Sequence, residues 1–188
     1  LPPKDPRIAD ILVIHGHALQ QAGLFDHPDS TPDENFRQAQ TELEEADRLY
    51  QQAAGNHQLE HARTLRFLAV DLDDLGQGDR ALQLNEQALN LFTTTLGEHS
   101  AETLNEKVTY ADELALSGRR EEAEKALRSA IAGLLVVRGP GHSDIGLADD
   151  RLARLLQETG RYEEANQAMT EAIDIGTRVY GPSSELVA

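Results

Sequence analysis

Residues 117–131 read SGRREEAEKALRSAI, and two other stretches of the chain follow the same pattern. Residues 75–89 read LGQGDRALQLNEQAL, and residues 159–173 read TGRYEEANQAMTEAI. The shared glycine recurs every 42 residues, at Gly76, Gly118 and Gly160. A fixed period of this length is typical of repeat proteins, in which each repeat is one supersecondary unit. The spacing therefore predicts a repeat fold.

Further small residues keep the same register. Four more series of alanine or glycine follow the 42-residue spacing: Ala39, Ala81, Ala123 and Ala165; Ala46, Ala88, Ala130 and Ala172; Ala69, Ala111 and Ala153; and Gly55, Gly97, Gly139 and Gly181. Apolar residues on either side of Gly76, over 58–75 and about 79–95, have the spacing of a helix face. Each repeat is thus predicted to be a helix hairpin, and hairpins must stack to bury their apolar faces.

The register predicts one array over 1–188 with hairpins at about 6–54, 58–95, 101–137 and 144–179. Gly16 takes the position of Ala69 in the first hairpin. The connection 23–34 is an insertion about eleven residues longer than its counterparts. Thr31 to Glu34 resembles a capping box that starts the following helix, and we expect Phe25 to be tucked into the array. Residues 183–188 read as the start of a further helix.

Composition excludes several classes of function. The net charge is −16, with 33 acidic against 17 basic residues, so nucleic-acid binding is not expected. No apolar run approaches the ~20 residues of a membrane span, and no membrane contact is expected. The chain starts LPPKDP without Met and ends within the next predicted helix, so we expect a soluble part of a longer protein. Its compartment stays open between cytoplasm and periplasm.

The stretch HQLEH, residues 57–61, has the H-x-x-E-H pattern of a zinc protease. His57 comes two positions after Gly55 and His99 two positions after Gly97, and His142 lies in the next such linker. A histidine that recurs between repeats is better explained as a packing or capping residue. The sequence contains neither the strand–turn–helix pattern of a nucleophile elbow nor a Gly-Lys-Ser/Thr phosphate loop. We therefore expect no metal, no cofactor and no catalytic residue.

These residues resemble a tetratricopeptide repeat. The order of a small residue, Gly, Ala and Ala is found at Ala111, Gly118, Ala123 and Ala130. The 42-residue length and the histidine-containing linkers are similar to the kinesin-light-chain subtype, although Leu72, Leu114 and Leu156 stand where that family has an aromatic residue. The resemblance covers about residues 6–181. It implies an all-α, right-handed α-solenoid of four stacked hairpins, a superhelix.

The resemblance also implies a protein-binding function. In this family the first helices of the hairpins line a concave groove that binds peptides. Transferred to this sequence, the partner-binding groove residues are Val13, His17, Arg63, Arg66, Val70, Asn105, Asp112, Asp150 and Arg154, with Asp10, Gln20, Asp73, Val108 and Leu147 at further groove positions.

Arg63 and Arg66 lie three residues apart on one helix face of an acidic protein. Arginine binds carboxylates through two parallel hydrogen bonds, which favours an acidic segment of a protein or peptide as partner. Pairing of these arginines with Asp73, Asp112 or Asp150 is the alternative. We therefore expect a non-enzymatic scaffold that recruits or senses a partner within a larger signalling protein, such as a bacterial serine/threonine kinase. A structural array that self-associates or packs against its parent chain is the second hypothesis.

Overall fold

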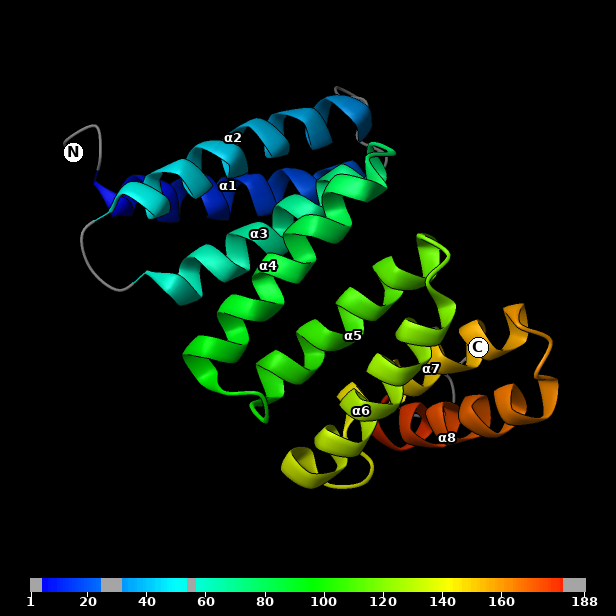
Figure 1. The fold of residues 1–188 in the computed structure, drawn as a ribbon. Coiled ribbons are helices and arrows are strands. Elements are labelled where there is room, and N and C mark those ends of the chain that lie inside the picture. The colour runs from blue at the N-terminus through cyan, green and yellow to red at the C-terminus, as the bar shows by residue number, and fades with distance from the viewer. Residues whose placement is uncertain (1–4, 25–31, 54–56, 181–188) are drawn as a thin grey trace. The chain divides into compact units, whose positions relative to one another are not determined.

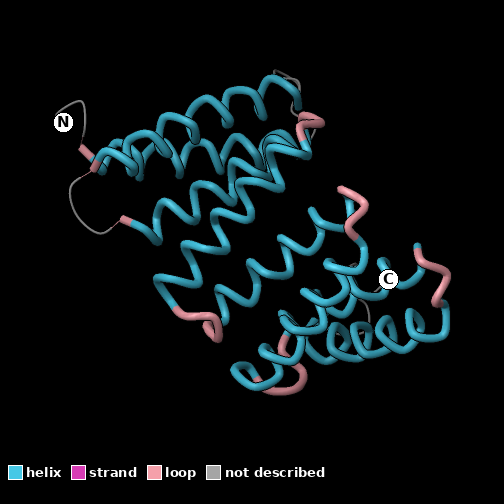
Figure 2. The backbone as a smooth tube through the Cα atoms, in the orientation of Figure 1, coloured by secondary structure: helices cyan, strands magenta, loops and turns pink. Residues whose placement is uncertain are grey.

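The computed structural model describes residues 5–24, 32–53 and 57–180, and this part of the chain forms eight α-helices and no strand (Figures 1 and 2). The all-α prediction is confirmed. The helices are α1 (Pro6–Leu24), α2 (Pro32–Gln52), α3 (Gln58–Asp74), α4 (Gly78–Leu96), α5 (Ala101–Leu116), α6 (Arg120–Arg138), α7 (Ser143–Glu158) and α8 (Tyr162–Tyr180).

The chain falls into two compact units, Leu1–Thr95 and Leu96–Ala188. Each unit contains two of the predicted hairpins, and the division comes at the linker that Gly97 marks. A single array across both units stays a prediction. The expected insertion lies largely outside the described residues, as do Phe25, Thr31 and residues 183–188.

The repeated glycines end the first helix of a hairpin. Gly76, Gly118 and Gly160 have φ angles of 73°, 82° and 77°, a region that residues with a side chain rarely adopt. Around Gly76 the backbone N–H of Gln77 donates to the Leu72 carbonyl at 2.7 Å, and that of Gly76 donates to the Asp73 carbonyl at 2.8 Å. This is a Schellman motif, which satisfies helix carbonyls that would otherwise lack a donor. The other two turns repeat the same bonds.

The linkers between hairpins provide helix caps. The Ser100 hydroxyl accepts a hydrogen bond from the Thr103 backbone N–H at 3.1 Å and caps α5. His142 caps α7, because its Nδ1 accepts from the Asp144 backbone N–H at 3.2 Å. At the corresponding place before α3, His57 makes no such bond, and its ring packs against Tyr50 with 5.9 Å between the ring centres.

The two helices of a hairpin cross where one of them carries a small residue. In three hairpins the small residue belongs to the first helix and the large one to the second. In the third hairpin the order is reversed. In hairpin order, the pairs are Ala9 with Leu49, Ala62 with Leu91, Leu104 with Gly133, and Gly146 with Ile175. A Cβ added at Gly133 would come within 2.7 Å of the Leu104 Cδ2, so this glycine makes room for the leucine.

The core of the first unit runs through α3. Leu68, Ala69 and Leu72 of that helix pack with Leu43 of α2 and Ala81 of α4. On α1, a Cβ at Gly16 would lie 3.0 Å from Leu43 Cγ. The small residue at Gly16 therefore lets α1 and α2 approach closely.

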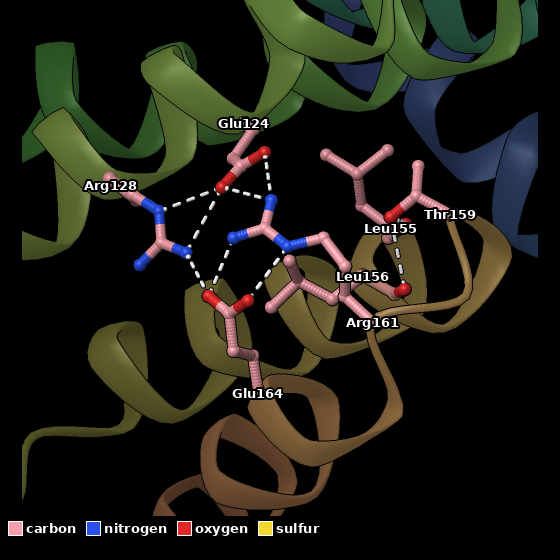
Figure 3. A network of polar contacts seen from close by, with 7 residues as sticks. All are labelled: Glu124, Arg128, Leu155, Leu156, Thr159, Arg161 and Glu164. Carbon is pink, nitrogen blue, oxygen red and sulfur yellow. Dashed lines mark hydrogen bonds and ion pairs between the residues drawn. The ribbon is translucent and has the colours of Figure 1, made fainter.

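Side-chain ion pairs join the second helices of the last two hairpins. Arg161, at the start of α8, reaches Glu124 of α6 with Nη1–Oε2 at 2.7 Å, while Arg128 of α6 reaches Glu164 of α8 at 3.2 Å (Figure 3). These contacts lower the pKa of both glutamates below its usual value. The alternating charges hold α6 and α8 together at this end.

The reversed pair in the third hairpin gives a test of the packing. We expect Leu104→Ala to lower the free energy of unfolding by about 2–5 kcal/mol, because it leaves a cavity. Gly133→Leu on its own should cost at least about 1–3 kcal/mol through overpacking, although leucine favours helix. The double variant restores the order of the other hairpins and should recover most of both losses. Urea denaturation followed by circular dichroism measures all three, and strictly additive losses would contradict this packing.

Candidate functional site

The predicted groove residues of the first unit gather on one face of α3. Arg63, Arg66 and Val70 follow each other at intervals of three and four residues, which places them on one stripe of the helix. Arg63 is exposed, Arg66 is half-buried and Val70 is 43% exposed. No ion pair to Arg63 is recorded within residues 5–24, 32–53 and 57–180. Its guanidinium therefore faces solvent.

The Phe67 ring contacts two of the predicted groove residues, and we call this group of His17, Arg66 and Phe67 the platform. The imidazole of His17 on α1 stacks on the Phe67 ring, with 4.7 Å between ring centres and 26° between planes. The guanidinium carbon of Arg66 lies 5.4 Å from the same ring centre and 5.7 Å from that of Phe92. Such geometry is that of a cation–π contact. Phe67 was not among the residues predicted from the sequence, although an aromatic residue next to a candidate arginine is a usable signal in a chain with only 4% aromatic residues.

A buried polar pair, Gln20 and Asp71, lies next to the platform and bonds to its backbone. Gln20 is 4% exposed, and its amide donates to the Phe67 carbonyl at 2.7 Å and to Asp71 Oδ1 at 3.0 Å. Asp71 is fully buried, and its Oδ2 has no hydrogen-bond partner in the described structure. Burial raises the pKa of Asp71 to about 7 despite the Gln20 bond, and the charge of Asp74 adds to the rise. Gln20 thus fixes α1 to α3 rather than lining a groove.

In the second unit several predicted groove residues make internal contacts. Asn105 donates its side-chain amide to Asp144 at 3.1 Å. Arg151 pairs with Asp112 at 3.1 Å, and Arg154 pairs with Asp150 at 3.6 Å. Internal pairing, the alternative considered for the arginines, is therefore what Arg154 does.

Two further groove expectations are wrong. Val108 is 5% exposed and Gln20 is buried as described above, so neither side chain is available to a partner. Among the other further positions, Leu147 is 55% exposed, Asp73 is exposed, and Asp10 accepts a hydrogen bond from the Tyr50 hydroxyl at 2.6 Å. Val13 is half-buried and packs against the core of the first unit.

The HQLEH stretch does not form a metal site in the described structure. His61 Nε2 lies 2.6 Å from Asp47 Oδ1 on α2, and His57 packs on Tyr50. The residues that the structure describes contain no group of three or more His, Asp or Glu side chains able to hold a metal ion. Nor does any helix among them have the length and apolar character needed to cross a membrane.

Comparison with known families confirms the repeat. A family model described as tetratricopeptide repeat matches residues 61–102 and 150–185. Among curated proteins, a clustered mitochondria protein homolog from Danio rerio is 27% identical over 146 residues, which is 78% of this chain. The chain spans about a tenth of the length of that relative and of a similar one from Aedes aegypti.

Solved structures show the same fold. BtubC (BKLC) from P. vanneervenii has a TM-score of 0.73 at 17% identity and covers 95% of this chain and 76% of its own. A Podosopora anserina putative kinesin light chain with nearly identical TPR-like repeats has a TM-score of 0.68 at 18% identity, covering 94% and 96%. YrrB, described as a TPR protein with an unusual peptide-binding site, has a TM-score of 0.54 at 21% identity, covering 95% and 86%. Residues 61–102 and 150–185 therefore match tetratricopeptide repeats, and the chain shares the helical repeat fold of these solved structures.

The buried Asp71 predicts a pH dependence of stability. Its pKa is raised in the folded state, so between about pH 4 and pH 7 the folded protein holds a proton that the unfolded chain has released. The free energy of unfolding therefore falls as pH rises through this window. Asp71→Asn keeps the acceptor for Gln20 but cannot titrate. We expect wild type to lose on the order of 3 kcal/mol relative to this variant between pH 4 and pH 8, measured by urea denaturation. Parallel pH curves for the two proteins would contradict this account.

Proposed function

We propose that this array of tetratricopeptide repeats is a non-enzymatic protein-interaction module, and that the first unit binds an acidic segment of its partner. The observation that carries the proposal is the platform on α1 and α3. Phe67 holds the ring of His17 and the guanidinium of Arg66 against itself, and Arg63 and Val70 flank it on the exposed stripe.

The chemistry of this platform suits a carboxylate next to an apolar or aromatic group. Arg63 offers an exposed guanidinium, which grips carboxylates bidentately. Arg66 is already oriented over two rings, so it loses little conformational freedom when it binds. Because the whole chain has a net charge of −16, it repels a negative segment at long range, and these arginines attract such a segment only at short range. Selectivity for carboxylates therefore rests on direct contact.

The residues of the second unit have a smaller part in this proposal. Asn105, Asp112, Asp150 and Arg154 are engaged with neighbouring side chains of α5 and α7. A partner that bound them would have to break these pairs. We therefore place the first contacts at Arg63, Arg66, His17, Val13 and Val70.

A larger regulatory parent stays a prediction. The matched stretch makes up about a tenth of each relative, and these relatives are described as clustered mitochondria protein homologs. The serine/threonine kinase given above as an example of a parent has no support from these comparisons.

Self-association is the second candidate function, and one surface favours it. Ile11 and Ile14 of α1 are 59% and 72% exposed and lie three residues apart on the same helix. Exposed apolar pairs of this kind occur at protein contacts. If they mediate dimers, Ile14→Glu should convert a concentration-dependent dimer into a monomer in light scattering. A wild-type protein that stays monomeric at high concentration would remove this candidate.

A displayed library of random twelve-residue peptides tests the binding function. We expect the selected peptides to be rich in Asp or Glu beside an aromatic or large apolar residue. Arg63→Glu should weaken their binding at least about tenfold, because it replaces the charge that grips the carboxylate. Isothermal titration calorimetry with a selected peptide measures the change.

Arg80→Glu is the matched control. Arg80 is exposed on α4 of the same unit and pairs with Glu44 at 3.4 Å, so the charge change is equal but lies away from α1 and α3. It should leave peptide affinity within about twofold. Equal loss in both variants would mean that net charge alone matters, and selection of no acidic peptides would overturn the proposed ligand.

A further inference from the structure

Two adjoining cavities within the second unit are lined by residues of α6, α7 and α8. Their volumes are approximately 290 Å³ and 200 Å³. They share Ile131 and Leu135 of α6, Asp149 of α7 and Glu171 of α8, and together form one slot. This volume is at the lower end for small-molecule sites, so it suits one inserted side chain better than a whole cofactor.

The walls of the slot combine apolar and polar side chains, and its two ends are defined. Leu152, Leu156, Ala168 and Ile175 add to the apolar lining. At one end lie Arg128 and Glu164, which are held in the ion-pair network of Figure 3. The turn at Pro140 and Gly141 and the side chain of Arg178 form the other end.

Asp149 places a carboxylate in this apolar slot without a counter-charge. It is 4% exposed, and within the described ranges no side chain or backbone group donates a hydrogen bond to it and no cation pairs with it. The charged group that acts on Asp149 is the carboxylate of Glu171, which repels it. Glu171 itself accepts a hydrogen bond from Gln167 at 3.3 Å. Burial and this neighbour raise the pKa of Asp149 to about 6.

Of the two basic groups around the slot, Arg128 is held in ion pairs and Arg178 donates to a backbone carbonyl. Arg128 lies within 3.2 Å of both Glu124 and Glu164. Arg178 donates from Nε to the Asp174 carbonyl at 3.0 Å. The lining holds four carboxylates, Asp149, Glu164, Glu171 and Asp174, against these two guanidinium groups. The slot is therefore negative at its centre.

The repeat fold does not require a carboxylate at this place. At the 42-residue spacing, Asp149 corresponds to Lys107 of α5 and Leu65 of α3. Burial of the Leu65 side chain does not lower the free energy of unfolding, whereas burial of an unpaired carboxylate such as that of Asp149 does. A cation that entered the slot would offset this cost, and its alkyl stem would cover the apolar walls.

We propose that this slot binds the ammonium group and alkyl stem of a lysine side chain that a partner polypeptide inserts between α6 and α8. The ammonium would pair with Asp149 and Glu171, and the methylene groups would contact Ile131 and Leu135. This site lies in the second unit and takes a basic group. It is therefore independent of the acidic segment proposed for the first unit.

Three small probes with the same six-carbon stem test the inference. Nuclear magnetic resonance of backbone amides in the whole chain would follow binding of n-hexylammonium, 1-hexanol and hexanoate at neutral pH. We expect n-hexylammonium to shift the amides of α6, α7 and α8 that line the slot. 1-Hexanol should bind about tenfold more weakly, because it lacks the charge that pairs with a carboxylate. Hexanoate should be repelled.

Two variants separate the site from the general acidity of the protein. Asp149→Asn conserves shape and should reduce n-hexylammonium affinity about tenfold while leaving 1-hexanol binding unchanged. Glu163→Gln, an exposed position on the same helix as Glu171, removes one charge outside the slot and should change neither. Equal binding of n-hexylammonium and 1-hexanol, an Asn variant that binds like wild type, or no binding of n-hexylammonium at the slot would each overturn the proposal.

Discussion

The close crossing of the two helices in each hairpin is the constraint on which the rest of the structure depends. Protein interiors are packed as densely as organic crystals, so two helices approach only where one of them gives up side-chain volume. This chain meets the requirement with a small residue opposite a large one in each hairpin. The third hairpin exchanges the two, with Leu104 opposite Gly133. Each pair combines a small residue with a large one, and either helix of the hairpin can supply the small residue.

Positions outside these small-residue series carry the features that differ between repeats. Asp71 corresponds to Glu113 and Leu155 at the 42-residue spacing, and Asp149 corresponds to Lys107 and Leu65. A repeat fold sums similar units, so a buried charge in one unit is not required by the others. Both aspartates carry a raised pKa because burial penalises the charged form. Of the two, Asp149 is the one that distinguishes its repeat, because Glu113, the counterpart of Asp71, is also a buried acid.

Ion pairs determine which charges remain available on this acidic protein. The arginines of α6 and α7, and Arg161 at the start of α8, lie within 3.8 Å of carboxylates. Such pairs contribute little stability each when exposed, but they occupy the guanidinium groups. Arg63 is exposed and unpaired in the described structure, and Arg66 is held over aromatic rings. Within the described residues, the second unit holds the buried carboxylate of Asp149, which forms no ion pair.

The sequence by itself determined the repeat length, the hairpins and most helix ends. The segments predicted at 58–75 and 79–95 agree closely with the helices Gln58–Asp74 and Gly78–Leu96. They could be predicted because glycines in the left-handed region and apolar periodicity determine helix ends and helix faces locally. Only the tertiary structure decided that the Phe67 ring stacks with His17, that Arg151 pairs with Asp112, and that Val108 is buried. These outcomes depend on residues up to about fifty positions apart that meet across helix faces. Spacing along the chain shows which side chains lie on the same face of a helix. Which residues of another helix they contact depends on how the helices pack.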